Sequence, residues 1–226
     1  MPTLKPAKNN QEANTINWPG RIPAVTDTKM IVAWNGLMIS GLARSYGVLK
    51  QPLYWELAVK ATQFILEKQW LNGRLHRINY EGNPSILAQS EDYALFIKAL
   101  LDLQKANPQD TQWLEKAIEI QQEFDQLFWS VEMGGYYNNA ADNSNDLLVR
   151  ERSYIDNATP SANGIAISNL VRLARLTDNL DYLDKAEKGL QAFSHILSQS
   201  PRACPSLLTA LDWYHFGCLV RTNSTL

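Results

Sequence analysis

The sequence predicts an all-α fold in which helical hairpins stack side by side or close into a ring. Three observations support this fold class. Apolar residues recur at spacings of three and four through most of the chain, as on one face of a helix. No long alternation of apolar and polar residues, which strands would show, competes with that periodicity. The segment 35–44 also has a copy at 163–172, and repeated hairpins must pack together because none buries its apolar face alone.

The internal repeat divides the chain into three units. An offset of 128 residues carries the segment 35–44 onto 163–172 and Tyr54 onto Tyr182. A weaker offset of 59 residues carries Tyr54 onto Trp113. Each of these aromatic residues begins the same pattern, in which an acid follows two positions later and an alanine four positions later. The common register predicts three copies of one helical hairpin.

Each unit is predicted to contain two antiparallel helices. In the first helix of unit one the apolar face is formed by Ile31, Trp34, Met38, Leu42, Tyr46 and Leu49. Its partner carries its apolar residues between positions 57 and 65, and the breakers Gly47 and Pro52 lie between the two helices. The later helices follow in order over residues 93–101, 113–127, 162–173, 182–193 and, as a seventh, 207–216.

Glycines inside the predicted helices indicate close helix–helix approach. Gly36 and Gly41 fall in the first helix of unit one, and Gly164 falls in the corresponding helix of unit three. A glycine within a helix costs about 1 kcal/mol relative to alanine, so its presence there indicates that a neighbouring helix packs too closely for a side chain.

Two long loops, over residues 72–90 and 130–159, follow the second helix of units one and two. The first has turn signals at Asn72-Gly73 and Glu81-Gly82 on either side of the segment 74–78, which predicts a short β-hairpin. The second holds the run Gly134-Gly135-Tyr136-Tyr137. Loops longer than ~12–15 residues in a compact domain are usually functional or disordered.

Length and composition fit a single globular domain. Of 226 residues, 45% are hydrophobic. The chain has 21 basic and 23 acidic side chains, so it has no basic excess that would favour nucleic acid as a partner. No apolar run reaches the ~18 residues of a membrane span, and no secretory signal is evident, so we expect a cytoplasmic protein with no membrane partner. Two cysteines and three dispersed histidines predict neither a metal site nor a cofactor. The domain is predicted over residues 27–218, between a polar, extended or disordered segment 1–26 and a tail 219–226.

The junctions between loops and helices form the candidate site. Each long loop leads into the first helix of the next unit, through residues 90–93 and 156–161, and Asp27-Thr28 holds the corresponding place in unit one. If the units pack side by side in one direction, the three junctions lie at one end of the molecule. Helix N-termini, polar side chains and long loops gathered there would suit a polyhydroxylated ligand.

Three carboxylates at these junctions are candidates for acid–base chemistry. Paired carboxylates perform this chemistry on sugars, so Asp92 and Asp156 are the first choices, with Glu91 in reserve. The alternative is that they only cap helices, since acids in a first turn complement the helix dipole. Further candidates for sugar contacts lie in the loops: His76, Tyr137 and Arg152. Their alternatives are a solvated hairpin histidine, a loop anchor and a surface salt bridge.

The junction motifs and the Gly134–Tyr137 run together resemble a known family. The motifs are Asp27-Thr28-Lys29 with Trp34-Asn35-Gly36, Glu91-Asp92-Tyr93-Ala94, and the run from Asp156 to Asn163. They are similar to the helical part of thioredoxin-domain-containing proteins of the spermatogenesis-associated-protein-20 type. That part belongs with the N-acylglucosamine 2-epimerase-like and six-hairpin glycosidase toroids. The resemblance covers residues 27–216 and implies an (α/α)6 barrel, or α/α toroid, with a sugar cleft at one end.

The resemblance also assigns pocket residues and shows where this chain departs from the family. It implies a pocket lined by Trp34, Asn35, Glu91, Asp92, Tyr93, Asp156, Thr159, Ser161 and Asn163. These 226 residues contain no thioredoxin-like domain. They provide about three hairpins and one further helix, whereas the family closes a ring of six hairpins. No histidine pair matches the catalytic pair of the epimerases. A partial toroid leaves apolar faces on its terminal hairpins, so we expect a homo-oligomer or a partner that completes the ring.

Three functional hypotheses remain open from the sequence. The first is a domain that binds or processes a sugar in a cleft at the N-termini of the inner helices, by isomerisation, hydrolysis or binding alone. The second is a catalytically silent helical scaffold or half-barrel that self-associates or binds a protein partner. The third is a stable fragment of a longer enzyme, without a function of its own.

Overall fold

The computed structural model describes residues 26–143 and 148–222, with side chains up to residue 216. This part of the chain contains eight α-helices and one small sheet, which confirms the all-α prediction. The predicted extended or disordered segment 1–26 lies outside the described residues, apart from Thr26, and so does the end of the predicted tail, residues 223–226.

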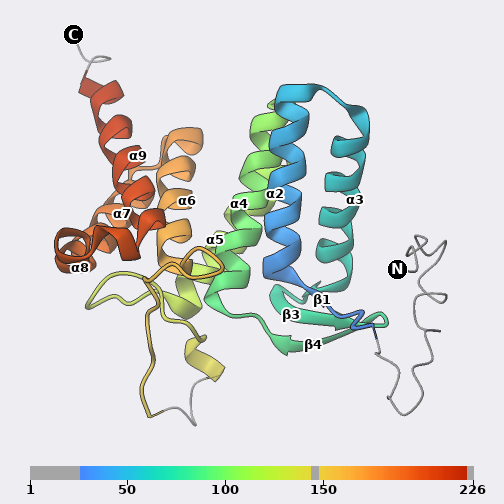
Figure 1. Cartoon of the computed structure of the whole chain (residues 1–226), viewed down its shortest axis with the longest axis horizontal. Coiled ribbons are helices and arrows are strands. Elements are labelled where there is room, and N and C mark those ends of the chain that lie inside the picture. Colours follow the sequence, from blue (N-terminus) through green and yellow to red (C-terminus); the bar gives the residue numbers. More distant parts are fainter. Residues whose placement is uncertain (1–25, 144–147, 223–226) are drawn as a thin grey trace, which may run out of the picture.

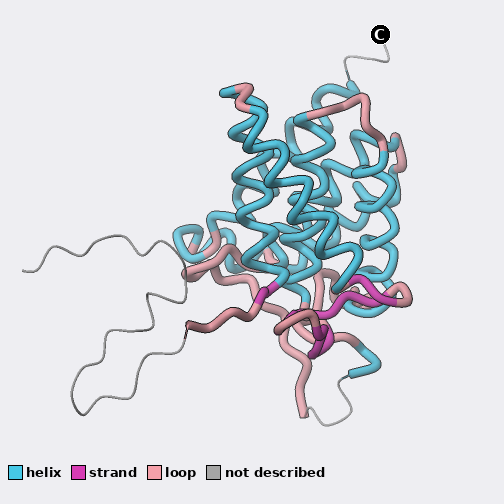
Figure 2. Tube along the Cα trace, turned by 90° about the vertical axis from the view of Figure 1, so that its right-hand side faces the viewer, coloured by secondary structure: helices cyan, strands magenta, loops and turns pink. Residues whose placement is uncertain are grey.

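Four helices form an inner layer in which each packs on the next and all run in the same direction (Figure 1). They are α2 (Val32–Leu49), α4 (Ser90–Ala106), α6 (Ala162–Thr177) and α9 (Pro205–Thr222). Three further helices pack on α2, α4 and α6 respectively as the second arms of the hairpins: α3 (Pro52–Lys68), α5 (Gln112–Phe128) and α7 (Leu180–Ala192). The N-termini of the inner helices therefore lie together, at the end that also holds the strands and the long loops (Figure 2).

The centre of the core is α4, which lies between α2 and α6 and is covered by α5. Every side chain of α4 from residue 92 to residue 104 is buried except Lys98. On its α5 side the Tyr93 ring stacks on Phe124, with centroids 5.2 Å apart and planes 7° from parallel. A helix that is apolar on nearly all sides is typical of an inner position.

The predicted apolar face of α2 is correct only in part, and the helix buries a different face more deeply. Ile31 and Leu42 pack against the core at intermediate exposure. Trp34 is 60% exposed and Met38 64% exposed. The residues of α2 that pack into the core are smaller: Val32, Ala33, Gly36, Ile39, Ser40 and Ala43. Small side chains allow α2 and α4 to approach closely, and this contact outweighs the greater apolar area of the other face.

Two of the three noted glycines have the packing reason predicted for them. A Cβ at Gly36 would lie 2.9 Å from the backbone oxygen of Leu95 in α4, and one at Gly164 would lie 2.8 Å from the backbone carbon of Ser206 in α9. Gly41 does not follow the prediction, since a Cβ there would meet no atom within 4 Å. The repeated glycine thus marks where one inner helix crosses the next.

The predicted β-hairpin is confirmed and is longer than expected. Strand β3 (Arg74–Tyr80) pairs antiparallel with β4 (Asn83–Leu87), with β2 (Trp70–Leu71) and with β1 (Met30–Ile31). Both predicted turns have left-handed backbones, with φ of 54° and 71° at Asn72-Gly73 and of 50° and 85° at Glu81-Gly82. Two-residue turns with positive φ match the twist of paired strands, which is why these dipeptides are reliable signals.

Other boundaries differ from the prediction. The last helix runs from Pro205 to Thr222, so it extends beyond the predicted domain end at residue 218. A short helix α8 (Ser194–Gln199) and the 3-10 turns Ala141–Asn143 and Pro201–Ala203 were not expected. Among the described residues, none of the helices is both long and apolar enough for a bilayer crossing.

Candidate functional site

Asp92 is completely buried and joins the N-termini of α2 and α4. Its Oδ1 accepts the backbone N–H of Ala33, at 3.0 Å, and its Oδ2 accepts Arg77 Nη1 at 2.7 Å and the backbone N–H of Gln89 at 3.0 Å. Ala33 is in the first turn of α2, where backbone N–H groups have no partner within the helix. Burial raises the pKa of Asp92, although Arg77 and the two backbone donors favour its ionised form. The carboxylate therefore holds two helix starts and faces no solvent.

Glu91 and Tyr93 take part in a second set of contacts at the same junction. Glu91 accepts a hydrogen bond from Arg77 at 3.3 Å, and its side chain is 32% exposed. The Tyr93 hydroxyl donates to Glu123 Oε2 at 2.8 Å, and Arg74 Nε lies 3.6 Å from Glu123 Oε1. Burial raises the pKa of Glu123 to about 7, against the opposing effects of Tyr93 and Arg74. Tyr93 thus ties α4 to α5 from within the core.

Glu123 was not among the site residues predicted from the sequence. This residue follows Ile120 by three positions and precedes Leu127 by four, which places it at the edge of the apolar face of α5. That spacing was the available signal for a partly buried carboxylate.

Asp156 joins the N-termini of α6 and α9, as Asp92 joins those of α2 and α4. Its Oδ1 accepts the Ser161 backbone N–H at 2.8 Å and the Ser206 hydroxyl at 2.5 Å, and its Oδ2 accepts the Ser206 backbone N–H at 2.6 Å. Ser161 is the N-cap of α6 and accepts from Gly164 N at 3.3 Å. Burial opposes ionisation of Asp156, but the hydrogen bonds from Ser206 and Ser161 outweigh it and hold the pKa of this carboxyl below its usual range.

Asn163, Arg152 and Tyr137 fasten the second long loop to the helices. Asn163 Oδ1 accepts the Tyr136 backbone N–H at 2.6 Å, and its Nδ2 donates to Tyr136 O at 3.0 Å and to Ser153 O at 2.8 Å. Arg152 Nη1 donates to the backbone oxygen of Gly134 at 2.5 Å. The Tyr137 ring lies under Arg150, with 4.1 Å between guanidinium carbon and ring centroid. All three side chains are engaged within the protein.

The remaining sequence candidates each have their own contacts. Asn35 donates to the backbone oxygen of Ile31, at 2.9 Å, inside the first turn of α2. His76 is a half-buried residue of β3, and Thr159 accepts the backbone N–H of Asn157 at 3.0 Å through its backbone oxygen. Trp34 projects outward from α2. The candidates share one end of the molecule, and of them Asp156 alone lines either of the two pockets described below.

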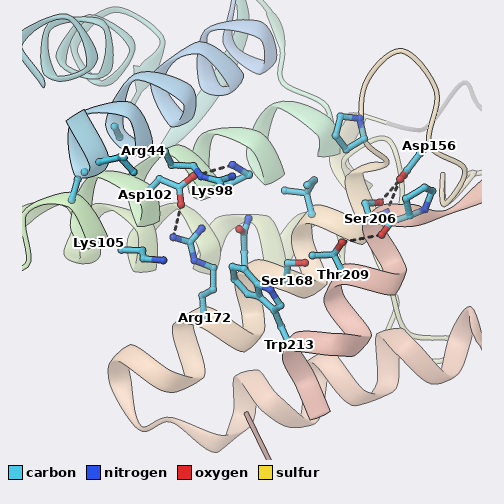
Figure 3. Close-up of a pocket in the computed structure, with 18 of the residues that line it drawn as sticks. Arg44, Lys98, Asp102, Lys105, Asp156, Ser168, Arg172, Ser206, Thr209 and Trp213 are labelled. Carbon is cyan, nitrogen blue, oxygen red and sulfur yellow. Dashed lines mark hydrogen bonds and ion pairs between the residues drawn. The ribbon is translucent and has the colours of Figure 1, made fainter. Parts of the chain in front are cut away.

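A pocket of about 670 Å³ lies between the inner helices α2, α4, α6 and α9 (Figure 3). Of the residues predicted for the site, Asp156 alone belongs to its lining. This pocket therefore lies along the inner helices and not around the rim of loops.

A buried ionic cluster forms one end of this pocket. Asp102 accepts Arg172 Nη2 at 2.7 Å, Lys98 Nζ at 2.9 Å and the Ser40 hydroxyl at 2.5 Å. Burial opposes ionisation of Asp102, but Arg172, Lys98 and Ser40 outweigh it and lower the pKa of this carboxyl. The cluster was not predicted from the sequence. The sequence indicates it by a Lys98–Asp102 pair, four residues apart, in a segment, 93–103, whose other residues are apolar or aromatic.

The other pocket walls offer an aromatic ring and polar groups. Trp213 of α9 faces Arg172, whose guanidinium carbon lies 5.6 Å from the ring centroid. Asn169 is 1% exposed; its Nδ2 donates to Ala94 O at 2.8 Å, while its Oδ1 accepts no hydrogen bond within the described structure. An unsatisfied buried acceptor costs about 1–3 kcal/mol, so it favours a donor entering from the pocket. Ser168 and Thr209 add hydroxyl groups to the lining (Figure 3).

Comparison with known proteins identifies relatives by sequence. The chain is 38% identical over 202 residues to spermatogenesis-associated protein 20 of Rattus norvegicus, and 37% identical over 196 residues to that of Homo sapiens. The chain is homologous to part of spermatogenesis-associated protein 20. These matches cover 85% and 82% of the chain but only 26% and 25% of the two relatives. The chain therefore spans about a quarter of the length of spermatogenesis-associated protein 20. No protein-family model matches the chain.

Solved structures confirm the predicted α/α-toroid fold. Cellobiose 2-epimerase from Bacillus thermoamylovorans superposes with a TM-score of 0.61 at 16% identity, over 76% of this chain and 46% of the epimerase. A GH76 α-mannanase from Bacteroides thetaiotaomicron superposes with a TM-score of 0.59 at 16% identity, over 77% of this chain and 45% of the mannanase. A D-mannose isomerase gives a TM-score of 0.59 at 17% identity, over 75% of this chain and 42% of that protein. The described residues of this chain therefore have the α/α-toroid fold.

Proposed function

We propose that this chain binds a sugar in the pocket between its inner helices. The observation that carries the proposal is the unsatisfied Oδ1 of Asn169 in a pocket with the Trp213 ring. Sugar hydroxyls donate hydrogen bonds, and the apolar face of a sugar ring packs on an aromatic side chain, so the two features suit one ligand. The toroids that this chain resembles include sugar epimerases and glycosidases, which supports the same ligand class.

The proposed activity is binding without acid–base catalysis by the carboxylates of the pocket. Within the described residues, the pocket lining contains two carboxylates, Asp102 and Asp156, and both are occupied by several hydrogen bonds. Hydrolysis by a carboxylate pair needs one of them protonated. The pKa values of Asp102 and Asp156 are both lowered, which favours ionised side chains.

Replacing Trp213 by alanine is expected to weaken sugar binding. Isothermal titration with mannose, glucose and cellobiose should detect binding to the native chain, and Trp213→Ala should weaken it about 2- to 10-fold, the equivalent of ~0.5–1.5 kcal/mol. Trp34→Ala is the matched control, since Trp34 is the tryptophan among the aromatic residues predicted for the site and lies outside the pocket. Loss of binding in Trp34→Ala alone would place the sugar at the rim, and no binding of any sugar by the native chain would refute the proposal.

A second proposed function is self-association through an exposed apolar face of α2. This face, called here the α2 stripe, consists of Trp34, Met38 and Leu49, which are 58–64% exposed. Within the described residues α2 packs on one inner helix, α4, whereas α4 and α6 each pack on two. The solved toroids contain about twice the length of chain that aligns here, 45% and 46% being matched. A second copy of this chain would supply a similar number of hairpins, so it is the proposed occupant.

Acidic residues in the α2 stripe are expected to abolish the dimer. Light scattering after gel filtration should show a dimer for the native chain and a monomer for Trp34→Glu with Met38→Glu, because two charges would be buried without partners in the interface. The control is Val131→Glu, since Val131 is 84% exposed and lies in the loop after α5. A native chain that is monomeric at every concentration would refute the dimer.

A further inference from the structure

The pocket has an uneven charge distribution. Five cationic side chains line it, against two carboxylates, although the whole chain has more acidic than basic residues. The cations are Arg44, Lys50, Lys98, Lys105 and Arg172. Asp156 lies at the opposite end from the Asp102 cluster (Figure 3). One carboxylate, Asp102, therefore faces several cations in the region where α2, α4 and α6 approach their C-terminal ends.

Lys98 and Arg172 share the carboxylate of Asp102, which leaves the neighbouring cations without compensation. In the described part of the chain, no carboxylate forms an ion pair with Arg44 or Lys105. Burial lowers the pKa of Arg172 despite Asp102, and the charge of Arg44 lowers it further. Like charges held close together in a partly buried site repel each other, and a bound anion relieves that repulsion.

A second hollow, of about 550 Å³, meets the first at this cationic end. Lys105, Arg172 and Trp213 line both hollows, and the second adds one cation, Arg175, and one carboxylate, Asp212. The cations come from three different inner helices, α2, α4 and α6, so they surround a volume instead of lying along one exposed helix face. Arg172 also lies against Trp213, which places the charge beside the ring on which a sugar would pack.

We infer that the sugar carries an acidic group, a phosphate or a carboxylate, which Arg44, Lys105 and Arg172 bind. This inference rests on the proposed sugar-binding function and specifies its ligand class. Guanidinium groups match the geometry of phosphate and carboxylate oxygens, and lysine adds a mobile positive charge. The sugar ring packs on Trp213 near Asn169, and the acidic group reaches the cationic end.

Isothermal titration with matched sugars tests the inference. The probes are mannose, mannose 6-phosphate, mannuronate and inorganic phosphate. An acidic sugar should bind at least tenfold more tightly than mannose and than phosphate alone, and its affinity should fall as salt rises from ~0.05 to ~0.5 M. The double variant Arg44→Gln with Lys105→Gln should reduce the affinity for the acidic sugar to that for mannose and leave the affinity for mannose unchanged.

The controls separate this inference from the sugar-binding proposal. Arg44 and Lys105 are exposed, so their replacement should leave the melting temperature unchanged. Lys60→Gln, on the exposed side of α3, removes a positive charge outside the pocket and should leave every affinity unchanged. Equal affinities for mannose and both acidic sugars would overturn the inference and leave sugar binding intact. Phosphate binding as tightly as mannose 6-phosphate would overturn the inference, and failure of all sugars to bind would overturn both proposals.

Discussion

Replacing Asp92 by asparagine is expected to lower the free energy of unfolding by about 3–5 kcal/mol, the range for breaking a buried, hydrogen-bonded ion pair. The amide would leave Arg77 without the charge that now lies 2.7 Å away. It would also turn a donor group toward a site that holds three donors, namely Arg77 and the backbone N–H groups of Ala33 and Gln89. Both α2 and α4 would then lose a partner at their first turns.

Urea denaturation, followed by circular dichroism, measures this effect. Glu91→Gln is the neighbouring control; its side chain is 32% exposed, so loss of its contact with Arg77 should cost no more than about 1 kcal/mol. The result also decides between the two roles considered for Asp92. A catalytic residue that is not structural would tolerate the amide, so an unchanged unfolding midpoint for Asp92→Asn would contradict the structural role.

Replacing Gly164 by alanine is expected to cost about 3 kcal/mol, near the upper end for overpacking a core. The new Cβ would lie 2.6 Å from the Cβ of Ser206 and 2.8 Å from its backbone carbon. These atoms belong to the first turn of α9, which is fixed by Asp156 through two hydrogen bonds from Ser206. The clash therefore cannot be relieved by a side-chain rotation, and α6 and α9 must move apart.

Gly41→Ala provides the matched control, because it makes the same change inside another inner helix. A Cβ at Gly41 meets no atom within 4 Å, so alanine should stabilise the protein by about 0.5–1 kcal/mol through its higher helix propensity. Thermal melts of both variants give the comparison. If the two glycines respond alike, the close approach of α6 and α9 is not the reason for Gly164.

Local features of this protein could be predicted from the sequence because they depend on residues close together in the chain. The helices follow from apolar periodicity, and the β3–β4 hairpin follows from its two glycine-containing turns. The repeat of Gly36 at Gly164 even indicated where inner helices cross. The resemblance to spermatogenesis-associated protein 20 rested on the same local motifs.

The roles of the site residues required the tertiary structure. Asp92 and Asp156 follow the same sequence pattern whether they act on a ligand or hold helix ends. Only the positions of Ala33 and Ser206, which come from other parts of the chain, assign both to helix ends. The pocket could not be found from the sequence either, since its Asp102–Arg172 contact joins residues 70 positions apart.

The sequence by itself determined which segments are helices, where they turn and that they repeat. The tertiary structure alone decided which face of each helix is buried and which polar groups remain available. Trp34 illustrates the division: its spacing in the sequence is that of a core residue, yet it is 60% exposed. The physical reason is that periodicity is encoded within one helix, whereas burial depends on how closely a neighbouring helix can approach. In α2 the small residues lie on the face opposite Trp34, so that face packs against the neighbouring helix.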